Sequence, residues 1–169
     1  LLRRDFTINA MAMDIHPTRF GDLKDPFGGI LDIQKKILKT PLNSNETFSE
    51  DPLRIMRAAY FSAKLGFQLS DDCRLAMKQQ AHRIKIVSSE RIRDEFFKIL
   101  GTNKPSTGLT ILQKTGLMKI IFPEIDVMYG MEQSPEWHHK DIFAHTLNVV
   151  DNSAKLSKKM KLRFAALVH

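Results

Sequence analysis

The sequence has few of the residues that cross-link a chain or carry it through a membrane. It contains one cysteine, Cys73, which excludes an internal disulfide and is consistent with a reducing compartment. No run approaches the ~20 apolar residues of a membrane span, and no secretory signal is evident. Internal repeats and low-complexity stretches are also absent from the sequence. We therefore expect a cytoplasmic chain with no membrane partner.

Basic residues are in modest excess. The 169 residues include 26 Lys+Arg and 19 Asp+Glu, giving a formal net charge of +7, and 43% of them are hydrophobic. That composition is sufficient for a buried core, and the length allows one or two domains. A basic surface suits a polyanionic partner such as RNA, although charge alone does not identify one.

The order of local patterns predicts an α+β fold that is mostly α-helical. Short β-favouring runs at 10–15, 20–24 and 37–39 are separated by turn residues. The polar stretch 41–47 predicts a connector. Helical patterns follow it, at 52–65, 72–81, 89–100, 107–115, 119–122, 140–156 and 161–169.

Residues 50–57 (EDPLRIMR) combine carboxylates and guanidinium groups at a predicted helix start, with Ser49 as the expected cap. Asp51 and Arg54 are neighbours on one face, and Arg57 lies one turn further along it. An Asp acceptor beside an Arg donor complements the amino donor and ring-nitrogen acceptor of cytosine and adenine, whereas guanine and uracil present the reverse. The alternative is an ordinary solvated ion-pair face, worth a few tenths of a kcal/mol per pair.

Further motifs occur elsewhere in the sequence. In order, the further motifs are residues 3–5 (RRD), 25–32 (DPFGGILD), 48–58 (FSEDPLRIMRA) with 64–67 (KLGF), and 89–92 (SERI). This order resembles that of the class II nucleotidyltransferases, the family of the bacterial-type CCA-adding enzymes and poly(A) polymerases.

The resemblance implies a nucleotide-binding set consisting of Arg4, Asp5, Asn9, Asp51, Arg54 and Arg57. In it, the first three contact the ribose and phosphates, the next two hydrogen-bond the base, and the last faces the triphosphate. The implied enzyme adds CMP and AMP from CTP and ATP to the 3′ end of tRNA, with Mg²⁺ as cofactor. Bacterial poly(A) polymerases and CC-adding or A-adding enzymes share these motifs, so these activities are alternatives. A basic RNA-binding helical module without enzymatic activity is the alternative of another class.

The resemblance also implies a division of the chain. Residues 1–42 would form the end of a mixed β/α palm domain, 43–100 a helical neck with the nucleotide-recognition motif, and 101–137 a helical body. Residues 138–169 would begin a truncated HD-like domain.

Two histidines carry the resemblance to an HD domain. His145 matches its first histidine ligand and His169 the second, while the aspartate that follows the second histidine in that motif is not in the sequence. Two imidazoles on neighbouring helices can converge on one divalent cation. We expect an incomplete metal site here.

One part of the family pattern is missing. Members begin with a glycine-rich phosphate loop and an Asp-x-Asp pair that holds the catalytic metals, whereas this sequence starts at Leu1 with neither. Phosphoryl transfer needs those metal ions to bridge the phosphates and activate the nucleophile. We therefore expect a fragment that is inactive on its own, with its metal-binding carboxylates upstream of Leu1.

Overall fold

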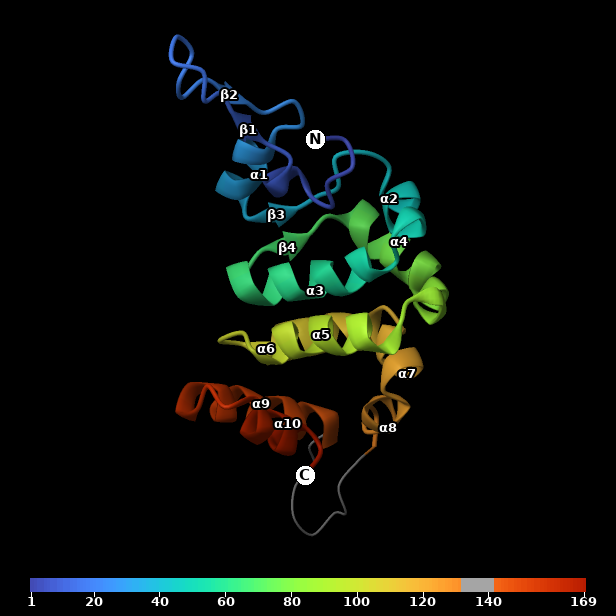
Figure 1. Cartoon of the computed structure of the whole chain (residues 1–169). Coiled ribbons are helices and arrows are strands. Elements are labelled where there is room, and N and C mark those ends of the chain that lie inside the picture. The colour runs from blue at the N-terminus through green and yellow to red at the C-terminus, as the bar shows by residue number, and fades with distance from the viewer. Residues whose placement is uncertain (132–141) are drawn as a thin grey trace.

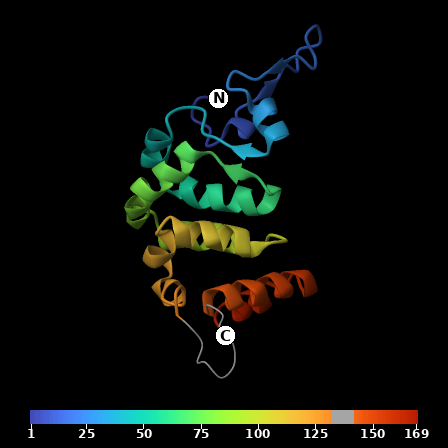
Figure 2. The same cartoon turned by 180° about the vertical axis from the view of Figure 1, so that it is seen from behind.

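The structure is a computed structural model that describes residues 1–131 and 142–169. Its elements follow one another as a curved stack, with the N-terminal β-containing part at one end and the C-terminal helices at the other (Figure 1). The view from behind shows the same order of layers (Figure 2). No helix in the described ranges is long and apolar enough to span a membrane.

The N-terminal part is built from short elements. They are η1 (Thr7–Asn9), β1 (Ala12–Met13), β2 (Leu23–Lys24), α1 (Gly29–Lys35) and β3 (Ile37–Leu38). Strands β1 and β2 are antiparallel, whereas β3 pairs in parallel with β4 (Gln68–Leu69) from beyond the next two helices. Helix α1 begins where the Asp25 carboxylate accepts the N–H groups of Gly29 and Ile30, and these bonds lower the pKa of Asp25 below its usual value.

The remainder of the described chain is helical. Its elements are α2 (Ser44–Glu50), α3 (Leu53–Leu65), α4 (Asp71–Gln80), η2 (Ala81–Ile86), α5 (Ser89–Leu100), α6 (Pro105–Lys114), α7 (Leu117–Ile121), α8 (Pro123–Asp126), α9 (Ile142–Leu156) and α10 (Met160–Leu167). The predicted α+β, mostly α-helical fold class is confirmed. Each predicted helical segment overlaps an observed helix, although the start of the segment 140–156 lies outside the described residues.

The prediction of a connector over 41–47 is wrong. Helix α2 begins at Ser44, because Oδ1 of Asn43 accepts hydrogen bonds from the backbone N–H groups of Asn45 and Glu46. The predicted Ser49 cap is also wrong, since Ser49 lies inside α2. The start of α3 is instead capped by the Asp51 carboxylate, which accepts the N–H of Leu53 at 3.2 Å.

Helix α3 lies at the centre of the core and packs against α5 and α6. Its residues Ile55, Met56 and Ala59 are completely buried. Gly108 lets α6 approach this closely, because a Cβ there would lie 2.5 Å from Cγ2 of Ile99 and 3.2 Å from the carbonyl oxygen of Ala59. The apolar side of α3 is therefore packed closely against α5 and α6.

A buried cation connects α10 to the preceding helices. Arg163 is 3% exposed and donates to four carbonyl oxygens, from Nη1 to Leu100 and Thr102, from Nη2 to Ala154, and from Nε to Ser157. The four distances lie between 2.7 and 3.0 Å. The C-terminal end of α5, the end of α9 and the start of α10 thus share one hydrogen-bonding centre.

Replacing this centre should destabilise the fold. For Arg163→Leu we expect the free energy of unfolding to fall by about 2–4 kcal/mol, because buried carbonyl groups lose their donors. For Arg163→Lys the free energy of unfolding should fall less, since one ammonium group still donates to some of these carbonyl groups. Urea denaturation measures both. Arg93→Leu, at an exposed arginine of α5, is the control, and equal losses for Arg93→Leu and Arg163→Leu would contradict this role.

Candidate functional site

Asp5 is the centre of the polar site at the N-terminal end of α3. Its Oδ2 accepts a hydrogen bond from Nε of Arg57 at 2.7 Å and lies 2.6 Å from Nη2 of the same arginine. Its Oδ1 accepts the backbone N–H of Phe6 and the side-chain amide of Asn9. Asp5 is only 7% exposed. The carboxylate therefore holds Arg57 and Asn9 in place, and both of its oxygens already have partners within the chain.

Arg54 is anchored in the same region. Its side chain is 13% exposed. Nη1 donates to the carbonyl of Thr47 at 3.2 Å and to Oε2 of Glu50 at 2.9 Å, and Nη2 donates to the carbonyl of Arg3 at 3.0 Å. A guanidinium has five N–H donors, so the N–H on Nε and one on Nη2 are still available. Arg54 and Glu50 therefore form an ordinary ion pair, but Arg54 still has N–H groups that can donate to another molecule.

Asp51 makes different contacts. Its Oδ1 accepts the N–H of Leu53, and its Oδ2 lies 3.4 Å from Nη2 of Arg91 on α5. The backbone N–H of Arg54 donates to the carbonyl oxygen of Asp51 at 3.0 Å, but within the described residues no hydrogen bond joins their side chains. Both carboxylate oxygens retain acceptor capacity, so Asp51 and Arg54 can each bind a third group.

A charged pocket of about 390 Å³ adjoins these residues, between the start of α3 and α5. It is lined by Asp51, which lies between α2 and α3, by Arg57 of α3, and from α5 by Arg91, Glu95 and Lys98, among others. The sequence analysis missed Glu95 and Lys98 as part of this site. Their spacing from Arg91, four and seven residues, places all three on one helix face and was the available signal.

Glu95 is unusual within this pocket. It is 4% exposed, its Oε1 accepts from Nζ of Lys98 at 2.7 Å, and its Oε2 is buried with no hydrogen-bond partner in the described structure. A buried carboxylate oxygen without a donor costs free energy. The pocket therefore holds unused hydrogen-bonding capacity beside Asp51 and Arg57.

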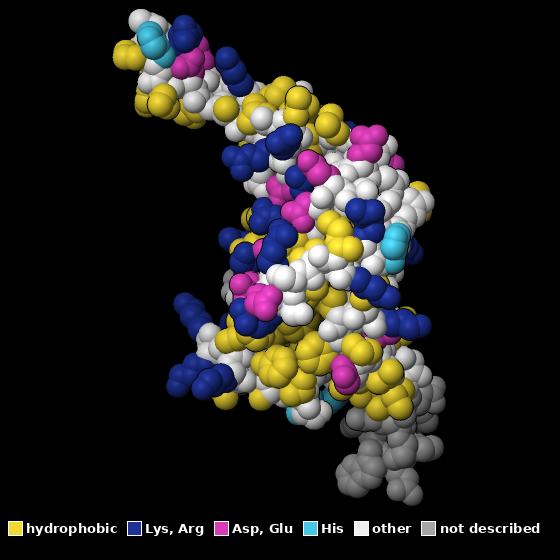
Figure 3. Space-filling view, turned by 45° about the vertical axis from the view of Figure 1, so that its right-hand side comes forward, with side chains coloured by type: hydrophobic (Ala, Val, Ile, Leu, Met, Phe, Trp, Pro, Cys, Tyr) yellow, Lys and Arg dark blue, Asp and Glu magenta, His cyan; other side chains and the backbone are white. Residues whose placement is uncertain are grey.

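The remaining member of the predicted set, Arg4, is exposed and forms no ion pair with any described residue. On the face shown in Figure 3, Lys and Arg side chains run along much of the molecule and mix with Asp and Glu near its middle. The structure thus brings Asp5, Asn9 and Arg57 into one network. Asp51 and Arg54 lie at the same end of α3, each with partners of its own.

The predicted histidine pair is brought together. The rings of His145 on α9 and His169, just after α10, have centroids 5.8 Å apart, and both residues are exposed. Nδ1 of His169 is 2.9 Å from the carbonyl oxygen of Ala166. The described residues contain no group of three or more His, Cys, Asp or Glu that could hold a metal ion. Among the described residues, no third ligand of these types joins His145 and His169, and no cluster of carboxylates of the kind that binds Mg²⁺ is found.

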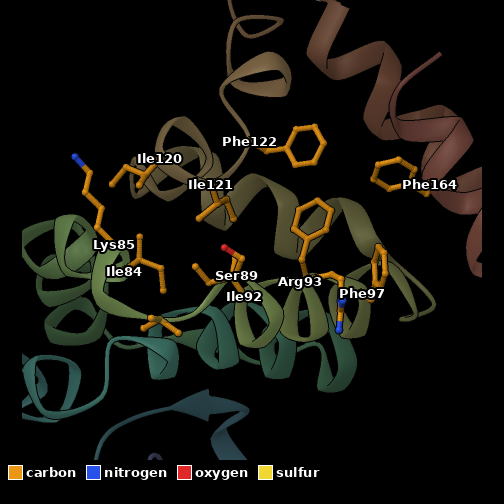
Figure 4. Close-up of a pocket in the computed structure, with 12 residues that line it drawn as sticks. Ile84, Lys85, Ser89, Ile92, Arg93, Phe97, Ile120, Ile121, Phe122 and Phe164 are labelled. Carbon is orange, nitrogen blue, oxygen red and sulfur yellow. The ribbon is translucent and has the colours of Figure 1, made fainter.

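A separate cavity of about 510 Å³ lies between α5, α7 and α10 (Figure 4). Its walls are largely apolar and include Ile92, Phe96, Ile121, Phe122 and Phe164. Phe96 and Phe122 stack with ring centroids 5.8 Å apart. Polar groups do not converge in it as they do beside Asp51, so the charged pocket is the better candidate for a nucleotide.

The coupling between Asp5 and Arg57 can be measured. In a double-mutant cycle with Asp5→Ala and Arg57→Ala, we expect an interaction energy of about 1–3 kcal/mol, because the carboxylate is buried and is both hydrogen-bonded to and ion-paired with the guanidinium. The pair of Arg54 with the solvent-exposed carboxylate of Glu50 should give only about 0.3–0.5 kcal/mol in the same analysis. Chemical denaturation of the four variants of each cycle provides the energies. Similar values for the two pairs would show that Asp5 does not organise the site.

Comparisons with known proteins find two family models and several relatives. The model of the poly A polymerase head domain matches residues 1–39, and that of the probable RNA and SrmB-binding site of polymerase A matches residues 66–129. The Multifunctional CCA protein of Vibrio campbellii is 41% identical over 175 residues, covering 100% of this chain and 41% of that protein. The chain therefore spans less than half the length of this curated relative.

Solved structures show the same relationship. The Bacillus stearothermophilus CCA-adding enzyme in complex with CTP has a TM-score of 0.72 and 28% identity, over 99% of this chain and 42% of the enzyme. A tRNA nucleotidyltransferase complexed with a primer tRNA and an incoming ATP analog has a TM-score of 0.74 and 25% identity, over 99% and 48%. With its motifs, its two matching family models and its fold in agreement, the chain belongs to the nucleotidyltransferase family of the CCA-adding enzymes and bacterial poly(A) polymerases.

Proposed function

We propose that the chain is the part of a CCA-adding tRNA nucleotidyltransferase that selects the incoming nucleotide. The whole enzyme would transfer CMP and AMP from CTP and ATP to the 3′ end of tRNA. The observation that carries this proposal is the start of α3, where Asp51 and Arg54 retain hydrogen-bonding capacity next to an Arg57 held by Asp5. The relatives named for CCA addition, and the solved relatives with CTP or an ATP analog, support it.

Base selection follows from the groups still available. Arg54 is fixed by three acceptors and keeps donors, while Asp51 keeps acceptors. Together they suit the amino and ring-nitrogen edge of cytosine or adenine and oppose the reversed edge of guanine or uracil. Because Arg54 is already ordered, little side-chain entropy is lost when a base binds.

The other residues of the site have roles consistent with their contacts. Arg57 and the exposed Arg4 would place positive charge near the triphosphate and ribose. We assign Asp5 a positioning role, since both of its oxygens already accept hydrogen bonds within the chain, from Arg57, Asn9 and the N–H of Phe6. This differs from the direct contact that the family resemblance implied.

The metal belongs to the proposal for the whole enzyme. Mg²⁺ would bridge the phosphates of the nucleotide and activate the tRNA hydroxyl. Since no suitable ligand cluster occurs in the described ranges, we expect no nucleotide addition by the 169-residue chain alone. A cytoplasmic location is part of the proposal and is consistent with the free, buried thiol of Cys73.

Poly(A) polymerase, CC-adding and A-adding activities would use the same helix start. Relatives named for CCA addition favour the CCA-adding enzyme over these. Assaying the full-length enzyme with each single nucleoside triphosphate, on tRNA that lacks its 3′ CCA, separates the four activities. No incorporation of any nucleotide would favour the non-enzymatic RNA-binding module.

Replacing Asp51 and Arg54 should change nucleotide choice. In the full-length enzyme, Asp51→Ala and Arg54→Ala should each reduce the preference for CTP and ATP over GTP and UTP by about 1–3 kcal/mol, because base discrimination is lost. Arg57→Ala should weaken all four nucleotides alike. Relative kcat/KM for the four triphosphates is the measurement.

The control for this experiment is Arg93→Ala, at an exposed arginine that pairs only with its neighbour Asp94 among the described residues. It should leave nucleotide choice unchanged. An unaltered preference in Arg54→Ala would mean that the motif is an ion-pair scaffold and that the base is read elsewhere.

We further propose that His145 and His169 form part of a divalent metal site that other residues of the full-length protein complete. Their 5.8 Å ring separation and their exposure support this. In the full-length protein, His145→Ala and His169→Ala should each lower the affinity for Mn²⁺ or Zn²⁺ by at least about tenfold. Isothermal titration measures the affinity, with the exposed His82→Ala as control. Unchanged affinity in both variants would remove the HD assignment.

A further inference from the structure

A small pocket lies at the corner between α9 and α10, where this corner meets the loop that follows α5. Its volume of about 370 Å³ is at the small end of the range for small-molecule sites, about 300–1,000 Å³. It shares no lining residue with the charged pocket at Asp51 or with the cavity between α5, α7 and α10. It is also separate from the histidine pair, since His145 lies near the start of α9 and the pocket adjoins the end of that helix.

The lining of this corner pocket is cationic. Arg163 of α10, Lys155 of α9 and Lys158 of the connecting turn contribute its charged groups. The other lining residues are uncharged, namely Asn103, Ala154, Leu156 and Ser157. No carboxylate of the described residues lines the pocket, so three cations surround one recess without an anionic partner in it.

Arg163 is a buried cation that forms no ion pair with any described residue. Its four hydrogen bonds all go to backbone carbonyl oxygens, which carry no net charge. Carbonyl groups at the C-terminal ends of α5 and α9 offset part of the guanidinium charge through the partial negative charge of helix ends. A guanidinium has five N–H groups, so one on Nη2 takes no part in these bonds. Arg163 can therefore donate to an anion in the pocket.

The two lysines add positive charge that no acidic side chain of the described residues neutralises. Lys155 donates to the neutral amide oxygen of Asn152 at 3.3 Å, and neither lysine forms an ion pair. Asp151, one turn before Lys155, already accepts hydrogen bonds from the N–H and the hydroxyl of Ser106. Both lysines are exposed, so their flexible side chains can move toward an anion.

Two neutral groups complete the set of donors. The hydroxyl oxygen of Ser157 accepts the N–H of Lys159 at 3.1 Å, and the hydroxyl hydrogen is still free to donate. The side-chain amide of Asn103 forms no hydrogen bond with another described residue. Guanidinium, ammonium, amide and hydroxyl groups all donate to oxyanions, and the charged donors do so most strongly.

We infer that the corner pocket binds a small phosphate-type oxyanion with at least two negative charges, such as pyrophosphate or inorganic phosphate. Arg163 donates to it from Nη2 at the base of the recess, and Lys155 and Lys158 neutralise it from α9 and the turn. The bound anion links the corner between α9 and α10 to the loop after α5, through Asn103. The inference does not rest on the proposed function, because the pocket shares no residue with the proposed nucleotide site.

A phosphate group of an RNA strand has the same chemistry, but the pocket favours a free anion. Arg163 is only 3% exposed, so an anion has to enter the recess to reach it. A phosphodiester carries a ribose on each side and cannot enter as deeply as a free anion. No aromatic ring lines the pocket, so it offers no surface on which a base could stack.

Site-resolved acetylation of the full-length protein tests this inference. The reactivity of each lysine toward acetic anhydride is followed by mass spectrometry while pyrophosphate is added at constant ionic strength. Lys155 and Lys158 should lose reactivity together over one range of pyrophosphate concentration, and inorganic phosphate should protect the same pair. The exposed Lys35 and Lys119, which do not line the pocket, should keep their reactivity. Equal protection of all four lysines, or protection of none, would overturn the inference.

A variant measures how much the pocket contributes to the affinity. Lys158→Gln should raise the pyrophosphate concentration that half-protects Lys155 by about tenfold, because one charge-assisted contact is lost. The matched control is Lys161→Gln, which removes the same charge from a nearby exposed position outside the lining. It should change that concentration by less than about twofold. Equal changes in the two variants would indicate general attraction of anions to this end of the molecule and would overturn the inference.

Two further measurements separate this pocket from other phosphate sites. Arg57→Ala should leave the half-protecting concentration at Lys155 unchanged, because Arg57 lines the other pocket. A rise equal to that in Lys158→Gln would place the pyrophosphate at the proposed nucleotide site, so the inference would fail while the proposed function stands. A short oligoadenylate is the RNA probe. If it protects Lys155 and Lys158 while pyrophosphate and phosphate do not, the pocket belongs to an RNA strand and the inference is wrong.

Discussion

The polar site depends on the buried carboxylate of Asp5. It connects two segments 52 residues apart in the sequence, because its Oδ2 accepts a hydrogen bond from Nε of Arg57 of α3 and lies 2.6 Å from Nη2 of the same arginine. Its Oδ1 accepts from Asn9 and from the N–H of Phe6, and the residue is only 7% exposed. Removing one partner would leave an uncompensated charge in a low dielectric, which is costly. This contact helps to hold the N-terminal segment against α3.

Helix α3 gives that contact its rigidity. Its apolar positions are enclosed by α5 and α6, and Gly108 allows α6 to approach the carbonyl of Ala59 closely. Arg54 and Arg57 therefore project from a helix that cannot rotate or shift without breaking the core, and Asp51 lies just before its first residue. Arg54 adds a second link to the N-terminal segment, through the carbonyl of Arg3. Preorganisation of this kind is what discrimination between similar bases requires.

The two polar surfaces of the molecule differ in chemistry. The pocket beside Asp51 combines both signs of charge, with Arg57, Arg91 and Lys98 near Asp51 and Glu95. Mixed donors and acceptors can distinguish one hydrogen-bonding edge from another. A second pocket, bounded by α4, α6 and the stretch from the end of α3 through β4, is lined by Arg74, Lys78, Lys104 and Lys114 and by no acidic side chain of the described residues.

The sequence by itself determined the helices whose apolar residues recur with helical spacing, such as α3 and α5, and which of their residues share a face. It could not reveal α2, whose residues Ser44–Glu50 are mostly polar and are made helical by the Asn43 cap and by burial of Phe48. Nor did local spacing predict the parallel pairing of β3 with β4. Local patterns report on a residue's neighbours along the chain and carry no distance to remote segments.

The candidate site shows the same division. Spacing alone placed Asp51, Arg54 and Arg57 on one side of a helix, and the family resemblance added Arg4, Asp5 and Asn9. Only the tertiary structure decided that Asp5 binds Arg57 and that Arg91 reaches Asp51. It also decided that Arg54 donates to Glu50 and to the Arg3 carbonyl. Hydrogen bonds are short and directional, so which partner each group takes is set by the folding of distant segments onto α3.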